Sequence, residues 1–203
     1  MKILHITTSP RGGGSVSHQL SRRVIERLLA QHPAAQVMSR DLSAEPLPHV
    51  DGQYASALGR SAGGAPQAQG LSSLAWSDLL IAELRQADYV VIGTPMHNFT
   101  VPSVLKAWID HVVRIGVTFD ATPEGKIGTL ADRPVVVAVS SGGYRNGERA
   151  RQPDFLEPYL RAILATIGLK NLRFLSVQPT AAGPDATTAA YAAVERELGA
   201  HFA

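Results

Sequence analysis

The segment at positions 8–17 reads TSPRGGGSVS and combines residues that favour anion binding. Glycines let backbone N–H groups approach an anion closely, and the hydroxyl groups of Ser9, Ser15 and Ser17 add donors. Arg11 adds a positive charge, and a helix that begins here directs the positive end of its dipole toward the same place. The pattern predicts a phosphate site of neither the Walker nor the GxGxxG type. A flexible glycine turn followed by a serine-capped helix explains the same residues equally well.

A second unusual segment, at positions 93–102, reads GTPMHNFTVP and separates an apolar run from a strongly periodic helical pattern. Met96 and Phe99 are large and apolar, Asn98 offers hydrogen-bond donors and acceptors, and two prolines stiffen the backbone. A stiff loop that carries apolar bulk beside amide groups suits a flat ring rich in heteroatoms. Taken alone, the segment also fits an ordinary strand-to-helix turn whose Met96 and Phe99 belong to the core.

A third segment, SSGGY at positions 140–144, follows the apolar run VVVAV. Its two glycines permit close backbone approach to a ligand, and Tyr144 can stack on a ring or donate a hydrogen bond. A plain glycine turn is again the alternative interpretation.

The elements that would position these segments follow from the hydrophobic pattern. Strands are expected at 2–7, 36–42, 88–93, 134–140 and 172–178. Apolar residues at helical spacing predict helices at 15–31, about 71–86, 103–114, 156–167 and from 184 or 185 to 198. Near-continuous apolar strands separated by helices indicate a parallel sheet covered on both faces. We therefore predict a doubly wound α/β fold with the flavodoxin-like strand order 2-1-3-4-5, which is favoured over a Rossmann half.

In this order the first, third and fourth strands are neighbours, so the three unusual segments converge on one edge of the sheet. That edge holds the carboxyl ends of the strands, where open α/β sheets bind ligands. Three coincident features are harder to explain as plain turns than one. Together they predict a phosphate site beside a slot for a planar ring, which is what flavin mononucleotide (FMN) requires.

Composition bounds the class of protein. The 203 residues, with 45% hydrophobic and 18% charged, fit one soluble domain spanning 1–203. A formal net charge of +2 is too weak to indicate nucleic-acid binding, and the absence of cysteine excludes thiolate chemistry. The histidines show no metal-ligand spacing. The first residues are too polar for a signal peptide and no apolar run reaches membrane-spanning length, so we expect a cytoplasmic protein with no membrane partner.

One stretch departs from the regular alternation of strands and helices. Residues 45–73 are interrupted by repeated glycines and prolines, which makes the connection between the second and third strands unusually long. Long loops of this kind are usually functional lids or mobile surface, so we expect parts of this insertion to be poorly ordered.

Apart from that insertion, the sequence resembles the FMN-dependent NADH-azoreductases, also described as FMN-dependent NADH:quinone oxidoreductases. The stretches that carry the resemblance are SPR at 9–11, SVS at 15–17, PMHNF at 95–99, LKAWID at 105–110, RIGVTF at 114–119, SSGG at 140–143, EPYL at 157–160 and IGL at 167–169. The resemblance implies that the serine cluster holds the FMN phosphate, with backbone help from Val16. The second segment then lies against the ring, and the third flanks the polar edge of the ring.

These implications define a set of expected FMN contacts. The set comprises Ser9, Arg11, Ser15, Val16, Ser17, Pro95, Met96, His97, Asn98, Phe99, Ser140, Ser141, Gly142, Gly143 and Tyr144. The family also implies a homodimer with active sites at the subunit boundary, where Phe119 would line the substrate pocket. Two residues depart from the family pattern: His97 stands where tyrosine is usual, and Ser141 where arginine is frequent. Substrate range and flavin potential are therefore expected to differ.

The resemblance further implies a two-electron cycle. NADH or NADPH reduces one tightly bound FMN per subunit and leaves, and a quinone or azo compound then accepts the electrons in the same slot. Because the flavin carries the chemistry, no side chain is expected to be catalytic. His97 and Tyr144 are candidate contacts of the acceptor, although His97 fits a packing or solvent-facing role equally well.

Three alternatives stay open at this point. The chain fits another NAD(P)H-dependent FMN or quinone reductase of the same superfamily. A non-enzymatic electron carrier of the flavodoxin type is disfavoured, because such carriers are usually strongly acidic for docking to their partners. The third alternative is a flavin-free regulatory or binding domain that kept the fold.

Overall fold

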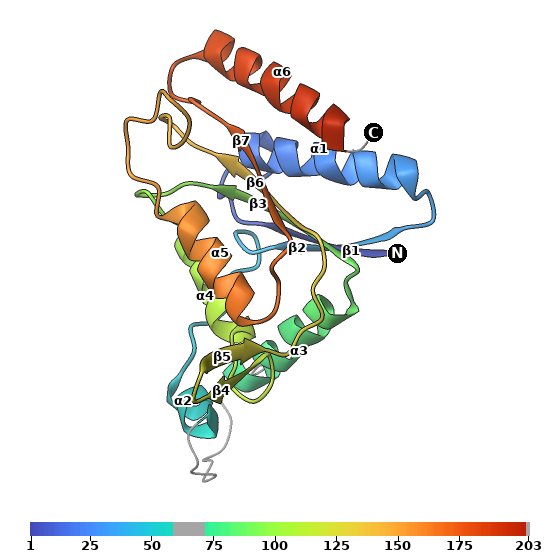
Figure 1. Ribbon diagram of the computed structural model, residues 1–203, viewed down its shortest axis with the longest axis vertical. Coiled ribbons are helices and arrows are strands. Elements are labelled where there is room, and N and C mark those ends of the chain that lie inside the picture. The colour runs from blue at the N-terminus through green and yellow to red at the C-terminus, as the bar shows by residue number, and fades with distance from the viewer. Residues whose placement is uncertain (59–71, 202–203) are drawn as a thin grey trace.

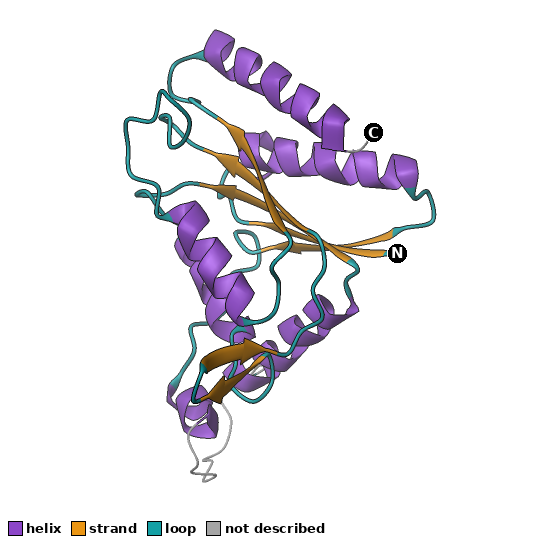
Figure 2. Ribbon diagram, viewed as in Figure 1, coloured by secondary structure: helices purple, strands orange, loops and turns teal. Residues whose placement is uncertain are grey.

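The computed structural model describes residues 1–58 and 72–201, which form a layered α/β structure. A five-stranded parallel sheet runs through its centre in the order β2-β1-β3-β6-β7 (Figures 1 and 2). Its strands are β1 (Lys2–Thr7), β2 (Gln36–Asp41), β3 (Tyr89–Pro95), β6 (Val135–Ser140) and β7 (Leu172–Val177). Counted along the chain, these five strands have the predicted order 2-1-3-4-5, which confirms the predicted fold class.

Helices cover both faces of this sheet. On one face lie α1 (Val16–Gln31) and α6 (Pro184–His201), and on the other lie α3 (Ser73–Gln86), α4 (Ser103–Val112) and α5 (Leu156–Thr166) (Figure 1). Each predicted helix is present, with ends that shift by a few residues. The predicted helix over 103–114 ends at Val112, shortly before Gly116 takes a positive φ of 72°.

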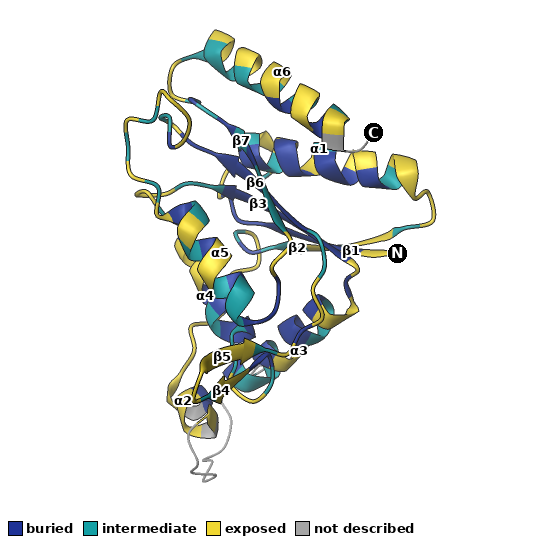
Figure 3. Cartoon of the chain, viewed as in Figure 1, coloured by how far each residue is buried: buried dark blue, intermediate teal, exposed yellow. Residues whose placement is uncertain are grey.

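The three central strands β1, β3 and β6 are buried from both sides, as their dark colour in Figure 3 shows, whereas the edge strands β2 and β7 are partly exposed. Every residue of β6 is buried, which matches its near-continuous apolar sequence. One apolar cluster joins the sheet to α4 through Leu105 and Trp108, and a second joins it to α1 through Leu20 and Val24. A parallel sheet packed on both faces holds the carboxyl ends of its strands in fixed relative positions.

Gly93 shows how closely α1 packs on this sheet. A Cβ atom at position 93 would lie 2.6 Å from the Ser21 Oγ of α1 and 3.0 Å from the Ser17 carbonyl oxygen. Only glycine allows this approach without a shift of the helix. The start of α1 is therefore held against β3, beside the point where β3 ends.

The sequence analysis missed an antiparallel hairpin formed by β4 (Phe119–Thr122) and β5 (Gly125–Gly128). Both strands are four residues long and mostly exposed, so they carry no strong alternation of apolar and polar residues. The hairpin lies closely against the turn that follows α5, because a Cβ at Gly128 would lie 2.1 Å from the Gly168 nitrogen. Another difference concerns the third strand, which extends past the predicted Gly93 to Pro95.

Part of the glycine- and proline-rich insertion is helical, where the sequence analysis expected a loop. Helix α2 (Gly52–Leu58) is anchored to α4, because the Tyr54 hydroxyl donates to the Asp110 carbonyl at 3.1 Å. The His111 Nε2 atom likewise donates to the Pro48 carbonyl at 2.9 Å. We expected parts of residues 45–73 to be poorly ordered, and residues 59–71 of that stretch lie outside the described residues. Within the described ranges, no helix has the length and apolar character needed to cross a membrane.

Candidate functional site

The three unusual segments leave the sheet from adjacent strands. The β1–α1 loop follows β1, the β3–α4 loop follows β3 and the β6–α5 loop follows β6, and these strands are consecutive in the sheet. All three loops therefore lie along the carboxyl edge of one parallel sheet. This is the edge at which open α/β proteins bind ligands.

The β1–α1 loop (residues 8–15) buries hydroxyl groups beside an open backbone. Ser9, Ser15 and Ser17 are all buried, and the Oγ atoms of Ser15 and Ser17 lie 3.0 Å apart. Ser15 occupies the N-cap position of α1, yet its side chain makes no capping hydrogen bond. At each of positions 12–14, an added Cβ would meet no atom within 4 Å. The helix start thus offers unused capping capacity and free space to a ligand.

Two threonines join this loop to the next one. The Thr8 backbone N–H donates to the Gly93 carbonyl at 3.1 Å, and the Thr8 hydroxyl donates to the Thr94 hydroxyl at 2.9 Å. Both side chains are fully buried. The sequence analysis did not single out either threonine, because a threonine at the end of a strand is too common to signal a contact.

The β3–α4 loop (residues 96–102) contains two consecutive strained residues. Asn98 has a φ of 47° and Phe99 a φ of 67°, in the left-handed region that suits glycine. Such conformations cost about 1 kcal/mol or more each and concentrate at functional sites. The turn is closed by reciprocal backbone hydrogen bonds of 2.9 Å between His97 and Thr100.

This turn directs its side chains outward. His97, Asn98 and Phe99 are exposed, and Phe99 retains 43% of its surface. Met96 is partly buried, but Phe99 does not belong to the core as the plain-turn interpretation required. A strained turn that exposes an amide and an aromatic ring fits a surface built to contact a ligand.

The β6–α5 loop (residues 141–155) is joined to the β3–α4 loop at both ends. At its start, the Met96 N–H donates to the Ser140 carbonyl at 2.8 Å, and at its end the Phe155 N–H donates to the Phe99 carbonyl at 3.0 Å. Ser140 and Ser141 are buried, whereas Gly142 is exposed. The two loops therefore act as one surface.

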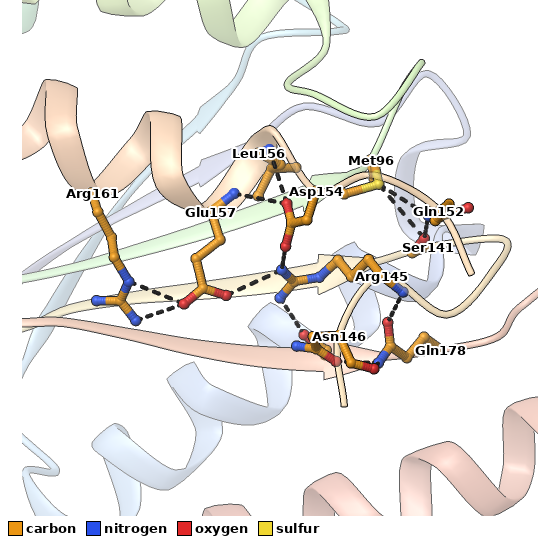
Figure 4. Close-up of polar contacts among 11 residues, drawn as sticks. Met96, Ser141, Arg145, Asn146, Gln152, Asp154, Leu156, Glu157, Arg161 and Gln178 are labelled. Atoms are coloured by element: carbon orange, nitrogen blue, oxygen red, sulfur yellow. Dashed lines mark hydrogen bonds and ion pairs between the residues drawn. The ribbon is translucent and has the colours of Figure 1, made fainter. Parts of the chain in front are cut away.

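The sequence analysis missed the buried polar network that holds this third loop (Figure 4). The Arg145 side chain has no exposed surface and pairs with Asp154 and with Glu157, the latter at 3.1 Å. It also donates to the Ser176 hydroxyl of β7 at 2.6 Å. The segment 144–154 has the composition of a polar surface loop. Nothing in its sequence indicates that Arg145 is buried and paired with carboxylates.

Gln152 is the other residue that the sequence analysis missed. Its Nε2 atom lies 2.8 Å from the Ser141 Oγ and 3.2 Å from the Met96 Sδ, so it bridges two of the three loops (Figure 4). Its position in the returning limb of the loop, eleven residues after Ser141, gave no sequence indication of this contact.

Two predicted site residues have other surroundings in the structure. Phe119 begins β4 and is buried with the Lys126 Nζ 5.1 Å from its ring centre. The hairpin lies near the far end of α5, away from the three loops (Figure 1), so one chain does not bring Phe119 to them. Tyr144 is half-buried, and the Arg149 guanidinium stacks 4.3 Å above its ring centre.

Among the described residues, no three histidine, cysteine, aspartate or glutamate side chains are grouped to hold a metal ion. The donors on the three loops include hydroxyl groups, backbone N–H groups and amides, together with the Arg11 guanidinium. Such donors suit phosphate oxygens and ring heteroatoms.

The sheet is parallel and doubly wound, and its carboxyl edge carries a glycine–serine loop and a strained loop with an exposed amide. Together these features define a nucleotide-binding protein of the open α/β class. A family model described as "Flavodoxin-like fold" matches residues 1–202. The chain belongs to this flavodoxin-like family.

Comparison with individual proteins shows which members of this family the chain is similar to. The chain is 48% identical over 92% of its length to a Pseudomonas fluorescens protein named FMN-dependent NADH:quinone oxidoreductase 4, and covers 88% of that protein. It is 49% identical over 88% of its length to FMN-dependent NADH:quinone oxidoreductase 5 of Burkholderia lata, and covers 85% of that protein. The crystal structure of an azoreductase from Bacillus anthracis superposes with a TM-score of 0.84 at 25% identity, over 100% of this chain and 98% of that one.

Proposed function

We propose that this chain is an FMN-dependent oxidoreductase that uses NADH or NADPH to reduce quinones and azo compounds by two electrons. One observation carries the proposal: the serine loop, where α1 lacks a side-chain cap, and the strained Asn98–Phe99 turn follow adjacent strands and are joined to each other. The names of the relatives, FMN-dependent NADH:quinone oxidoreductases and an azoreductase, support the same activity.

The β1–α1 loop would hold the FMN phosphate. Ser9, Ser15 and Ser17 supply hydroxyl donors, the backbone at Val16 supplies an N–H, and the exposed Arg11 supplies charge at the rim. The fit rests on the missing side-chain cap of α1 and on the free space around the three glycines. An anion at this point would complete the hydrogen bonding of the first turn of the helix.

The other two loops would hold the ring. Their backbone and side chains supply apolar contact, amide groups and glycine backbone at neighbouring points of one edge. The proposed ring contacts are Pro95, Met96, His97, Asn98, Phe99, Ser140, Ser141, Gly142, Gly143 and Tyr144. Buried cross-links between the loops, such as the one from Met96 N–H to the Ser140 carbonyl, keep this surface in place before a ligand binds.

Bound FMN supplies the capacity to accept and return a hydride equivalent. The chain's own residues bind and orient it, and they present an exposed face to the donor and the acceptor in turn. His97 and Tyr144 are proposed as contacts of the acceptor. None of the described side chains is required to take or give a proton to the nicotinamide.

We further propose that the active form contains a second copy of the chain. Phe99 and Phe155 expose 43% and 61% of their surfaces and are joined by a backbone hydrogen bond, so they form one apolar surface beside the proposed ring site. A second copy covering this surface would also be the source of the Phe119 that lines the substrate pocket. The exposed aromatic surface fits small, planar acceptors, and the cytoplasm stays the proposed location.

Steady-state kinetics test this function. Rates measured with NADH and with NADPH, each against a quinone and an azo dye, are expected to give parallel lines in double-reciprocal plots, because donor and acceptor use one slot in turn. Electron transfer to a small redox protein, with no turnover of any quinone or azo dye, would support the carrier alternative and overturn the proposal.

A further inference from the structure

The Gln152 side chain contacts the residues that directly follow β3 and β6, Met96 and Ser141. Its side-chain nitrogen donates to the Ser141 hydroxyl at 2.8 Å and to the Met96 sulfur at 3.2 Å. The Ser141 hydroxyl in turn donates to the same sulfur at 3.8 Å. The Gln152 nitrogen, the Ser141 oxygen and the Met96 sulfur are therefore the corners of a closed triangle of hydrogen bonds (Figure 4). Its donors are the two N–H groups of the amide and the hydroxyl of Ser141.

The oxygen of the Gln152 amide lies against the backbone of Gly143. A Cβ at position 143 would lie 2.7 Å from the Gln152 Oε1 atom. The amide thus occupies the space that any side chain at position 143 would fill. Gly143 and Gln152 are sterically matched, and the glycine backbone stays uncovered by a side chain of its own.

Gln152 is itself held by the Arg145 clamp. Asp154, two residues further along, pairs with the buried Arg145 guanidinium and also accepts the N–H groups of Leu156 and Glu157 at the start of α5. The Arg145 N–H donates to the Gln178 side chain at 2.9 Å, which attaches the outgoing limb of the loop to the segment after β7. Both limbs of the loop are therefore fixed, and the side chain of Gln152 is directed inward between them.

We propose that Gln152 is a positioning residue of the flavin site, acting through Met96 and Ser141. Met96 has three rotatable side-chain bonds and no shape preference of its own, so the amide and hydroxyl donors select one conformation for it. Ordering this side chain before binding removes an entropic cost that FMN would otherwise meet. The predicted effect of Gln152 on FMN binding rests on the proposed function, whereas its hydrogen bonds with Met96 and Ser141 do not.

The first test observes the clamp without any flavin. The chain contains three methionines, so protein labelled with ¹³C at the methionine methyl group gives a short spectrum in which Met96→Leu identifies the Met96 signal. Gln152→Leu keeps the bulk and removes both donors; it is expected to shift or broaden the Met96 signal and to leave the Met38 signal unchanged. Arg151→Leu is the matched control, because Arg151 is exposed and its side chain donates to carbonyls of its own loop.

The second test measures FMN binding by the apoprotein. Gln152→Leu is expected to weaken FMN affinity about five- to tenfold, the equivalent of one net hydrogen bond, and to alter the visible spectrum of bound FMN. Arg151→Leu should match the wild type in both measurements. Gln152→Glu keeps the shape, but its carboxylate can only accept the Ser141 hydroxyl proton, so Met96 loses both of its donors. This variant should therefore change the Met96 signal and weaken FMN binding as Gln152→Leu does, and it serves if the leucine variant does not fold.

The outcomes of the two tests distinguish a failure of the positioning role of Gln152 from a failure of the proposed FMN-dependent function. A Met96 signal and an FMN affinity in Gln152→Leu that match Arg151→Leu would overturn the positioning role. A changed Met96 signal in a protein whose wild type binds no FMN would leave the clamp standing and overturn the proposed function instead.

Discussion

The Thr8 hydroxyl donates to the Thr94 hydroxyl at 2.9 Å, and the Thr94 hydroxyl donates onward to the Pro95 carbonyl at 3.1 Å. This buried relay joins the loop proposed for the phosphate to the loop proposed for the ring. Both loops leave from neighbouring strands, so the relay fixes the spacing between the two halves of the proposed site.

Replacement of Thr94 by valine should weaken this spacing. The change keeps the shape and removes the Thr94 acceptor, while the Thr8 hydroxyl retains the Gly93 carbonyl at 3.3 Å, so the loss is about 0.5–1.5 kcal/mol in unfolding free energy. Urea denaturation measures the loss, and FMN titration of the apoprotein should show weaker binding. In Thr8→Val/Thr94→Val both partners are removed, so the double variant should lose less than the sum of the single variants. Strict additivity would show that the two hydroxyl groups do not interact.

Asn98→Ala should weaken FMN binding or slow turnover far more than His97→Ala. Asn98 holds a φ of 47° that asparagine tolerates better than alanine, so the change adds strain of about 1 kcal/mol and removes the amide. Asn98→Gly separates these causes because glycine adopts this conformation without strain. If Asn98→Gly restores FMN affinity, the backbone carries the effect; if it does not, the amide does. Equal losses in the His97 and Asn98 variants would mean that the ring contacts are wrongly assigned.

His5 should make stability depend on pH. The Ser21 hydroxyl donates to the His18 carbonyl at 2.9 Å, so the neutral His5 ring donates from Nε2 to the Ser21 oxygen at 2.8 Å. Burial, assisted by the neighbouring His18 and Arg22 side chains and opposed by Asp41, lowers the pKa of His5 from 6.5 to about 4. The unfolded chain therefore binds the proton more readily than the folded chain between these two values.

The sign of the effect follows from that difference. Stability is complete above pH 6.5 and falls as the pH drops toward 4, by about 3 kcal/mol in total. His5→Gln keeps an N–H donor but does not titrate, so its stability should be flatter across this range in urea unfolding experiments. Wild-type and variant profiles that stay parallel between pH 7 and pH 4 would contradict the assignment.

Arg145→Met should destabilise the protein strongly. The substitution leaves Asp154 and Glu157, whose side chains are mostly buried, without their shared cation, at a cost of about 3 kcal/mol. Arg145→Lys keeps the charge but lacks the planar fork that reaches both carboxylates and Ser176, so it should recover only part of the loss. Thermal unfolding measures both variants. A wild-type melting temperature in Arg145→Met would show that the clamp does not hold the loop.

Much of the fold could be predicted because its signals are local. The apolar run before Ser140 and the periodic helix after Pro102 determine a buried strand and a helix without reference to the rest of the chain. The hairpin beginning at Phe119 could not be predicted in this way, because it is short, exposed and held by the backbone approach of Gly128 to Gly168.

The residues of the candidate site likewise fall into those that the sequence marks and those that it does not. Ser9, Ser15 and Asn98 stand in segments whose composition is unusual, so the sequence alone marks them. Gln152 and Arg145 act through contacts with residues distant in the chain, in a stretch that has the composition of a plain surface loop. The positive φ at Phe99 is likewise invisible in the sequence, because no glycine marks it.

The central claim is tested most directly by the visible spectrum of the purified protein during turnover. The account predicts a flavin absorption band, retained or restored by one equivalent of FMN per chain, that NADH bleaches without oxygen and that a quinone brings back. Protein that shows no flavin band, takes up no added FMN and leaves NADH unoxidised in the presence of a quinone would contradict it.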